Sequence, residues 1–110
     1  MEKAIMSLVM PCYGCEKTIK KAIESILDQD ESRWELICVV NGQWEGREKT
    51  EKIIKQYAKK DERIQLISLE GEGNACRARN YGASHSNGRY ISFFSSDFFM
   101  FPGAITKWLA

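Results

Sequence analysis

Apolar and polar positions along the chain form two alternating kinds of segment. Some runs are almost continuously apolar, as in strands that are buried on both faces of a parallel sheet. The predicted strands are residues 4–10, 34–40, 64–69 and a last run that ends near Phe94. Between them, apolar residues recur three and four positions apart, as on one face of a helix. The predicted helices are residues 16–29, 48–60, 74–84 and 102–109.

The regular order of strand and helix predicts an α/β fold. A Rossmann-like, open and mostly parallel sheet with helices on both faces fits this order, because strands without alternation must be covered on both sides. A chain of 110 residues is enough for one modest hydrophobic core. We therefore predict a single domain over residues 1–110.

The charge balance excludes several classes of partner. Sixteen basic and fifteen acidic residues give a net charge of +1, so neither nucleic acid nor an anionic membrane is indicated. The first apolar run is too short for a signal core or a membrane span. We expect a soluble, cytoplasmic protein, with association at the cytoplasmic face of a membrane left open.

The last predicted strand leads to one acidic residue. The stretch ISFFSSDFFMFP stops at Asp97 and then becomes aromatic as far as Pro102. Open α/β sheets bind ligands outside the carboxyl ends of their strands, where a carboxylate is suited to a metal–phosphate group. The alternative from sequence alone is a solvated turn or a helix N-cap.

Cys12 and Cys15 form a Cys-x-x-Cys pair after a strand and before a helix, where thioredoxin-like proteins carry their redox pair. Such folds also need a proline that faces the pair from a later strand, whereas Pro102 follows the last strand. No second close pair or histidine completes a zinc site. Without secretory context, the four cysteines are predicted to be reduced and structural.

Several motifs occur in a recognisable order: SLVMPCYGCEKTIKKAIESILDQ, WELICVVNGQ, ARNYGAS and GRYISFFSSDFFMFPGAI. Over essentially the whole chain they resemble the opening half of a family-2 glycosyltransferase with the GT-A nucleotide-sugar-binding fold. The resemblance implies binding of a nucleoside-diphosphate sugar. In this reading Pro11 and Tyr13 match the family's Pro-x-Tyr-Asn, with Gly14 in place of asparagine. Glu16 matches an acidic position near the base.

Further matches extend along the chain. Ser25 and Gln29 match Ser-x-x-x-Gln, and Glu35 matches the glutamate before the second strand. The family's Ala-Arg-Asn-x-Gly is intact from Ala78 to Gly82. The resemblance places its arginine, Arg79, near the nucleotide.

The family's Asp-Asp-Gly-Ser is replaced by Val40, Asn41, Gly42 and Gln43. The resemblance places Asn41 at the nucleotide, but Val40 cannot accept the hydrogen bond of a base N–H. One such bond is typically worth about 0.5–1.5 kcal/mol net, so the identity of the base is left open.

The family's metal motif, Asp-x-Asp, keeps only its last carboxylate, as Ser95, Ser96 and Asp97. The resemblance implies that Asp97 helps to hold Mg²⁺ or Mn²⁺, hard cations that one or two carboxylates and the substrate phosphates often share.

The resemblance implies transfer of the sugar to an acceptor hydroxyl, on an unknown saccharide or lipid-linked acceptor, by the full-length enzyme. Family members continue into an acceptor-binding half that carries the catalytic base. We therefore assign no catalytic residue and expect this chain alone to be inactive. The aromatic segment around Phe94 to Phe101, with Trp108, predicts a homo-oligomer. The alternatives are a catalytically silent nucleotide-sugar-binding or interaction module and a thiol–disulfide oxidoreductase.

Overall fold

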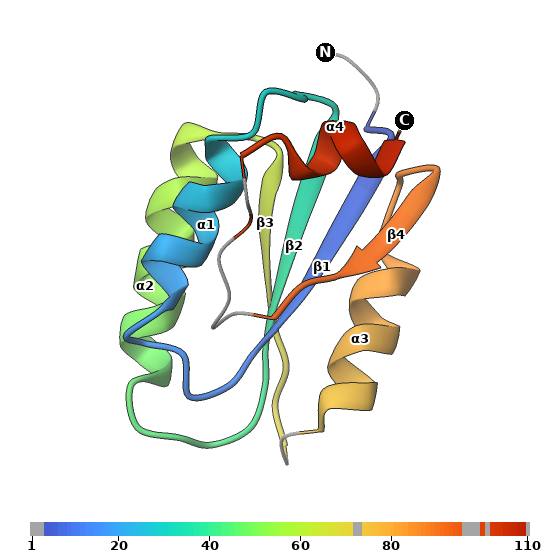
Figure 1. Ribbon diagram of the computed structural model, residues 1–110. Coiled ribbons are helices and arrows are strands. Elements are labelled where there is room, and N and C mark those ends of the chain that lie inside the picture. The colour runs from blue at the N-terminus through green and yellow to red at the C-terminus, as the bar shows by residue number, and fades with distance from the viewer. Residues whose placement is uncertain (1–3, 72–73, 96–99, 101, 110) are drawn as a thin grey trace.

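The computed structural model describes residues 4–71, 74–95, 100 and 102–109. Over these residues strands and helices alternate (Figure 1): β1 (Met6–Cys12), α1 (Ile19–Leu27), β2 (Trp34–Val40), α2 (Arg47–Lys60), β3 (Ile64–Ser68), α3 (Ala75–Ser84), β4 (Tyr90–Phe93) and α4 (Ala104–Leu109). The strands form one sheet in the order β3-β2-β1-β4, and each neighbouring pair is parallel. The predicted open, parallel α/β sheet is confirmed.

Successive residues of β1 and β2 enter two separate cores. Leu8, Met10 and Cys38 belong to the core that α1, α2 and α4 cover, whereas Val9 and Val39 pack with α3 on the other face. Figure 1 shows α1 and α2 on one side of the sheet and α3 on the other. Because helices cover both faces of the sheet, odd-numbered and even-numbered residues of these strands are buried alike. This explains why these strands are continuously apolar.

β1 runs to Cys12 and contains a proline, although it is an inner strand. The carbonyls of Ile5 and Val9 accept from the amides of Tyr90 and Phe94, so the odd residues of β1 face β4. The ladder with β4 ends at Val9, which leaves Pro11 beyond its last pair. The missing N–H of Pro11 thus falls on the β4 side, past the last pair of that ladder, and costs no hydrogen bond with β2.

Two helices begin two or more residues later than the sequence pattern predicts. α1 begins at Ile19 instead of residue 16, after a turn in which the carbonyl of Cys15 accepts from the amides of Thr18 and Ile19. α4 begins at Ala104 instead of residue 102, because Gly103 has a φ of 77° and cannot belong to a right-handed helix.

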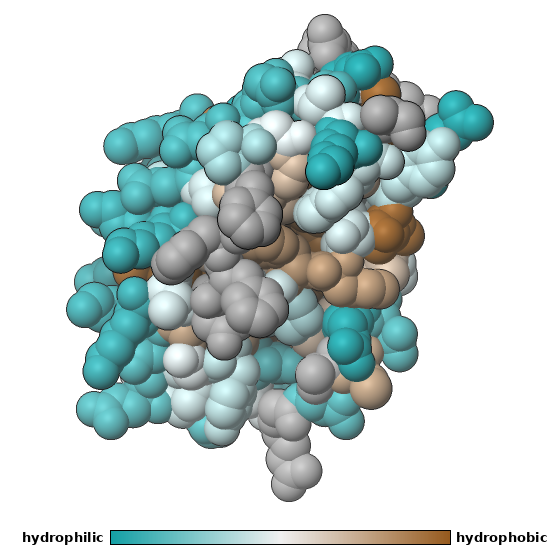
Figure 2. All heavy atoms as spheres, in the orientation of Figure 1, coloured by the Kyte–Doolittle hydropathy of each residue, from teal (hydrophilic) through white to brown (hydrophobic). Residues whose placement is uncertain are grey.

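Apolar side chains gather over β4 on the face shown in Figure 2, whereas the surface over α1 and α2 is mostly hydrophilic. Tyr90, Ile91 and Phe93 of this edge strand are each about half-exposed. Among the described residues, none of the helices has the length and apolar character needed to cross a membrane.

Candidate nucleotide site at the carboxyl edge of the sheet

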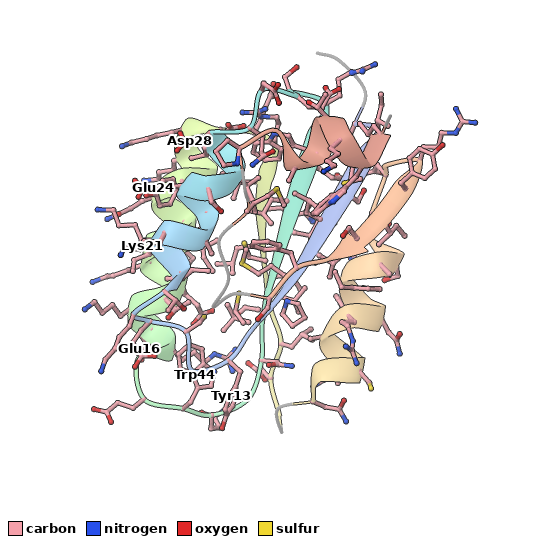
Figure 3. The ribbon with its side chains drawn as sticks, viewed as in Figure 1. Tyr13, Glu16, Lys21, Glu24, Asp28 and Trp44 are labelled. Carbon is pink, nitrogen blue, oxygen red and sulfur yellow. The ribbon has the colours of Figure 1, made fainter. Side chains whose placement is uncertain are left out.

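The strands of the parallel sheet all end at one edge, here called the carboxyl edge. Tyr13 follows β1 and Trp44 follows β2, and Figure 3 shows both at this edge. Their ring centroids are 5.7 Å apart at an interplanar angle of 51°, and Tyr13 is 60% exposed. The strand order reverses between β1 and β4, which is where open α/β sheets form their ligand crevice. Tyr13 and Trp44 thus form an aromatic rim beside that point.

The loop between β2 and α2 is held by polar contacts of its own. Asn41 is only 2% exposed, and its Nδ2 donates to the carbonyl of Asn74 at 2.9 Å. The carbonyl of Asn41 accepts from Trp44 Nε1, also at 2.9 Å. Val40 lies fully buried in the core. The end of β2 therefore offers no carboxylate, and the side-chain amide donor of Asn41 is engaged.

Arg47 fastens the same loop to the end of β3. Its guanidinium donates to the carbonyl of Gly42 at 2.5 Å and to that of Leu69 at 2.8 Å. It also donates to Ser68 Oγ at 3.1 Å, and its Nε lies 3.6 Å from a carboxylate oxygen of Glu51. The charge of Arg47 is thus used to fix two loops in place.

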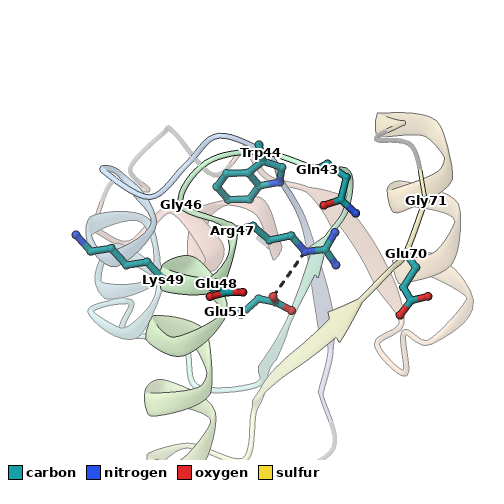
Figure 4. A pocket seen from close by; sticks show the side chains of 9 residues that line it. All are labelled: Gln43, Trp44, Gly46, Arg47, Glu48, Lys49, Glu51, Glu70 and Gly71. Atoms are coloured by element: carbon teal, nitrogen blue, oxygen red, sulfur yellow. Dashed lines mark ion pairs between the residues drawn. The ribbon is translucent and has the colours of Figure 1, made fainter.

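A hollow of about 760 Å³ opens between the β2–α2 loop, the start of α2 and the end of β3 (Figure 4). It is lined by Gln43, Trp44, Gly46, Arg47, Glu48, Lys49, Glu51, Glu70 and Gly71. Trp44 lines this hollow and also contacts Tyr13, so its ring lies between the hollow and the loop that follows β1. Sequence reasoning missed Trp44, because no matched motif contains it.

The side chain of Glu16 packs against the loop that carries Trp44. A Cβ on Gly46 would lie 2.8 Å from Glu16 Cδ, so the side chain of Glu16 packs directly against the residue before α2. Gly46 also has a φ of 92°, which favours glycine. Glu16 Oε2 is buried and has no hydrogen-bond partner among the described residues. Glu16 therefore borders the loop that carries Trp44.

The remaining predicted residues lie apart from the hollow. Pro11 is half-buried near the end of β1. Arg79 is an exposed residue of α3 whose guanidinium carbon lies 6.0 Å from the ring centroid of Phe93. Asp97 lies outside the described residues. Pro11, Tyr13 and Asn41 thus meet at the carboxyl edge, and Arg79 contacts β4 from the other face of the sheet.

Two of the matched motifs have a structural role that the sequence did not reveal. Ser25 Oγ accepts from the amide of Met100 at 2.8 Å, and Gln29 Oε1 accepts from the amide of Ile105 at 3.2 Å. These contacts tie α1 to the chain that follows β4. In the second motif, a Cβ on Gly82 would lie 2.4 Å from Val9 Cγ1, so glycine lets α3 pack closely on β1.

The cysteines do not form a reactive pair. Cys12, Cys15 and Cys38 are buried thiols that form no disulfide, and Cys76 is exposed. Hydrogen bonding with Cys15 and Cys38, together with burial, raises the pKa of Cys12 well above its usual value. Reactive cysteines need a lowered pKa and access to solvent. Cys12 and Cys15 therefore belong to the core, which agrees with a structural role for this pair.

Among the described residues, no three His, Cys, Asp or Glu side chains are placed to hold a metal ion. The proposed cation ligand, Asp97, is not one of these residues.

The comparison with protein families decides the assignment. The model of glycosyl transferase family 2 matches residues 7–110. The chain belongs to glycosyltransferase family 2. TuaG of Bacillus subtilis (strain 168), named as a glycosyltransferase of teichuronic acid biosynthesis, is 37% identical over 95 residues, which are 86% of this chain and 36% of TuaG.

A second relative is the Escherichia coli UDP-Glc:alpha-D-GlcNAc-diphosphoundecaprenol beta-1,3-glucosyltransferase WfgD. It is 32% identical over 97 residues, which are 88% of this chain and 36% of WfgD. Among solved structures, the mannosyltransferase PcManGT from Pyrobaculum calidifontis, in complex with GDP-Man and Mn²⁺, has a TM-score of 0.78 at 20% identity. The match covers 99% of this chain and 33% of PcManGT, and it confirms the GT-A fold. The chain thus spans about a third of the length of these relatives.

Proposed function

We propose that this chain binds a nucleoside-diphosphate sugar at its carboxyl edge, as part of a glycosyltransferase that transfers the sugar to an acceptor hydroxyl. The observation that best supports this proposal is the aromatic rim of Tyr13 and Trp44. The rim lies beside the point where the strand order of the sheet reverses, in a chain of glycosyltransferase family 2. An aromatic rim suits a planar base, and loops at this edge are where such sheets bind nucleotides. The names of WfgD and PcManGT include UDP-Glc and GDP-Man, which supports this class of donor.

We further propose that Asp97 holds Mg²⁺ or Mn²⁺ together with the donor's phosphates. The sequence Ser95-Ser96-Asp97 offers oxygen donors alone, which is the chemistry that hard cations prefer. The cation would neutralise the diphosphate leaving group. The Mn²⁺ in the PcManGT complex supports this choice. For the acceptor, the name of WfgD favours a lipid-linked saccharide.

Isothermal titration calorimetry with uridine and guanosine diphosphates, with and without Mn²⁺, tests the proposal. We expect saturable binding of both nucleotides, strengthened by the cation. If neither nucleotide binds at millimolar concentration, a silent interaction module replaces the proposal. The buried Val40 in place of a carboxylate is the observation that favours that second candidate.

Of the aromatic segment expected to form the contact between copies, Phe94 packs against the core, Met100 is buried, and residues 98, 99 and 101 lie outside the described residues. We therefore propose that the chain self-associates through the exposed apolar side chains of β4 instead. Tyr90, Ile91 and Phe93 lie on an edge strand, which can pair with a second copy. Light scattering from micromolar to tens of micromolar protein should show the mass rising to that of a dimer or larger. A constant monomer mass would contradict self-association and leave nucleotide binding untouched.

A further inference from the structure

The charges of the chain are divided unevenly over its structure. α1 and α2 together carry eight basic and three acidic residues, a net charge of +5. The rest of the chain carries the remaining eight of sixteen basic residues and the remaining twelve of fifteen acidic residues, a net charge of −4. The total of +1, from which no anionic partner is expected, therefore averages two regions of opposite sign.

Seven exposed lysines of these two helices form a surface that is here called the lysine face. They are Lys20 and Lys21 of α1 and Lys49, Lys52, Lys55, Lys59 and Lys60 of α2. α1 and α2 lie on one side of the sheet (Figure 1), and the surface over them is mostly hydrophilic (Figure 2). The lysines therefore lie on the same side of the molecule.

Two of the three acidic residues of these helices are engaged within the protein. Glu24 hydrogen-bonds with the side chain of Tyr57, and a carboxylate oxygen of Glu51 lies 3.6 Å from Arg47 Nε. Glu48 is exposed at the start of α2. The lysine face thus presents a clear excess of positive charge to solvent.

Most of this charge lies on α2, because α1 ends at the acidic Asp28 (Figure 3). From Lys52 to Lys60, α2 has four lysines and no acidic residue. Lys59 and Lys60 lie in the last turn, where the helix dipole favours basic residues. Lys55 and Lys59 are four residues apart, a spacing at which like charges destabilise a helix. Folding alone therefore does not explain the lysines before the last turn, whereas an anionic partner would offset their repulsion.

The chemistry of the lysine face fits an anionic lipid surface better than a nucleic acid. Sites for single-stranded nucleic acid combine basic groups with aromatic rings that stack on the bases. Among the described residues, the large apolar side chains that are exposed all lie outside α1 and α2. Lysine acts as a flexible point charge, which suits the diffuse negative charge of lipid headgroups.

We propose that the lysine face docks this protein onto an anionic lipid surface. The choice of a lipid partner rests in part on the proposed lipid-linked acceptor, whereas the division of charge does not depend on the proposed function. Both helices begin at the carboxyl edge, so docking along them brings the aromatic rim close to the headgroups. Repulsion between the surface and the rest of the chain, with its net charge of −4, favours this orientation.

Co-sedimentation with vesicles tests the docking. One vesicle preparation contains phosphatidylcholine alone, and the other contains equal parts of phosphatidylcholine and phosphatidylglycerol. We expect binding to the anionic vesicles only, and its loss in about 1 M salt, where the Debye length is about 3 Å. No binding to anionic vesicles at low salt, or equal binding to both preparations, would overturn the proposal. Tighter binding to duplex DNA at the same phosphate concentration would replace the lipid partner by a nucleic acid.

Paired variants locate the docking surface. Lys55→Gln combined with Lys59→Gln should weaken vesicle binding by about tenfold or more, since each lysine near an anionic surface contributes about fivefold. Arg77→Gln combined with Arg89→Gln is the matched control, because it removes the same charge from exposed residues of α3 and of the turn before β4. The control should change vesicle binding by less than about threefold. Equal weakening by both pairs would show that only the net charge matters and would contradict the lysine face.

The affinity for uridine diphosphate separates this proposal from the proposed function. The Lys55→Gln and Lys59→Gln protein should keep the nucleotide affinity and the urea-unfolding midpoint of the unchanged chain, because glutamine and lysine have similar helix propensities. Nucleotide binding without vesicle binding would overturn the docking alone. Vesicle binding without nucleotide binding would overturn the proposed function and leave the docking in place.

Discussion

The two edges of the sheet carry hollows of similar size, and the side chains around them make different contacts. The hollow at the carboxyl edge measures about 760 Å³, and a second one of about 700 Å³ lies at the amino edge, where the strands begin. At the amino edge Arg33 pairs with Glu31 and Arg63 pairs with Asp61. At the carboxyl edge Asn41 and Arg47 hold the loops, and the rim of Tyr13 and Trp44 is left for a ligand. The volume of a hollow therefore does not identify a ligand site. The side chains that remain available to a ligand, here the rings of Tyr13 and Trp44, distinguish the two hollows.

Pairing at the amino edge is extensive. Glu35 accepts from Ser7 Oγ at 2.5 Å and from the backbone amides of Asn87 and Gly88. Arg63 pairs with Asp61 at 2.7 Å, and its guanidinium carbon lies 3.9 Å from the ring centroid of Trp34. These contacts join β1, β2 and β3 to the turns beside them. We therefore assign the amino edge to stability.

Removing Glu35 should produce the largest loss of stability. Glu35→Ala leaves the hydroxyl of Ser7 and the amide of Asn87 without their acceptor, whereas the amide of Gly88 keeps Ser7 Oγ at 2.7 Å. We expect the free energy of unfolding to fall by about 2–4 kcal/mol in urea denaturation. Nucleotide affinity of the folded fraction should not change. If Glu35→Ala weakened nucleotide affinity and left the free energy of unfolding unchanged, the assignment of stability to the amino edge and ligand binding to the carboxyl edge would be wrong.

Removing Gln29 should have an intermediate effect. Gln29→Ala deprives the buried amide of Ile105 of its acceptor, at a cost of about 1–2 kcal/mol in thermal or urea unfolding. The matched control is Gln56→Ala, at an exposed position of α2, which should change stability by less than about 0.5 kcal/mol. Equal effects of the two variants would show that Gln29 does not anchor the chain after β4.

The smallest effect is a pH dependence at the amino edge. Hydrogen bonding to Arg63 lowers the pKa of Asp61, and hydrogen bonding to Arg33 lowers the pKa of Glu31 to about 2. Lowered pKa values in the folded state add stability above the ordinary pKa of each acid and lose it as the pH falls through the folded value. Asp61→Asn should reduce stability at pH 7 by less than about 1 kcal/mol and flatten its decline in acid. An unchanged acid profile would contradict the Asp61–Arg63 pairing.

Most of the fold could be predicted from the sequence. β1 and β2 are buried on both faces of the sheet, so their sequences are almost continuously apolar. The predicted end of the first strand at residue 10 was wrong. β1 continues to Cys12, and Pro11 does not interrupt it because Pro11 lies past the last pair with β4. The start of α4 was misplaced because Gly103 adopts a left-handed conformation after Pro102. Neither fact is visible before the pairing and the backbone torsions are known.

The site was less predictable than the fold. Motif matching found Pro11, Tyr13 and Glu16 near the carboxyl edge, but it gave no sign that the amide donor of Asn41 is engaged with Asn74. Trp44 carries no periodic or motif signal, and Gln43 stands only where the family's Asp-Asp-Gly-Ser has its serine. Their role depends on which loops meet across the sheet edge, which is a property of the tertiary structure.

The central claim is that the carboxyl edge, and not the amino edge, binds the nucleoside diphosphate. Amide and indole chemical shifts of the ¹⁵N-labelled chain during titration with uridine diphosphate and Mg²⁺ test it most directly. We predict saturable shifts at Tyr13, Gln43 and Trp44 and none at Glu35 or Asn87. Shifts confined to the amino edge, or no shifts at either edge at millimolar nucleotide, would contradict the account.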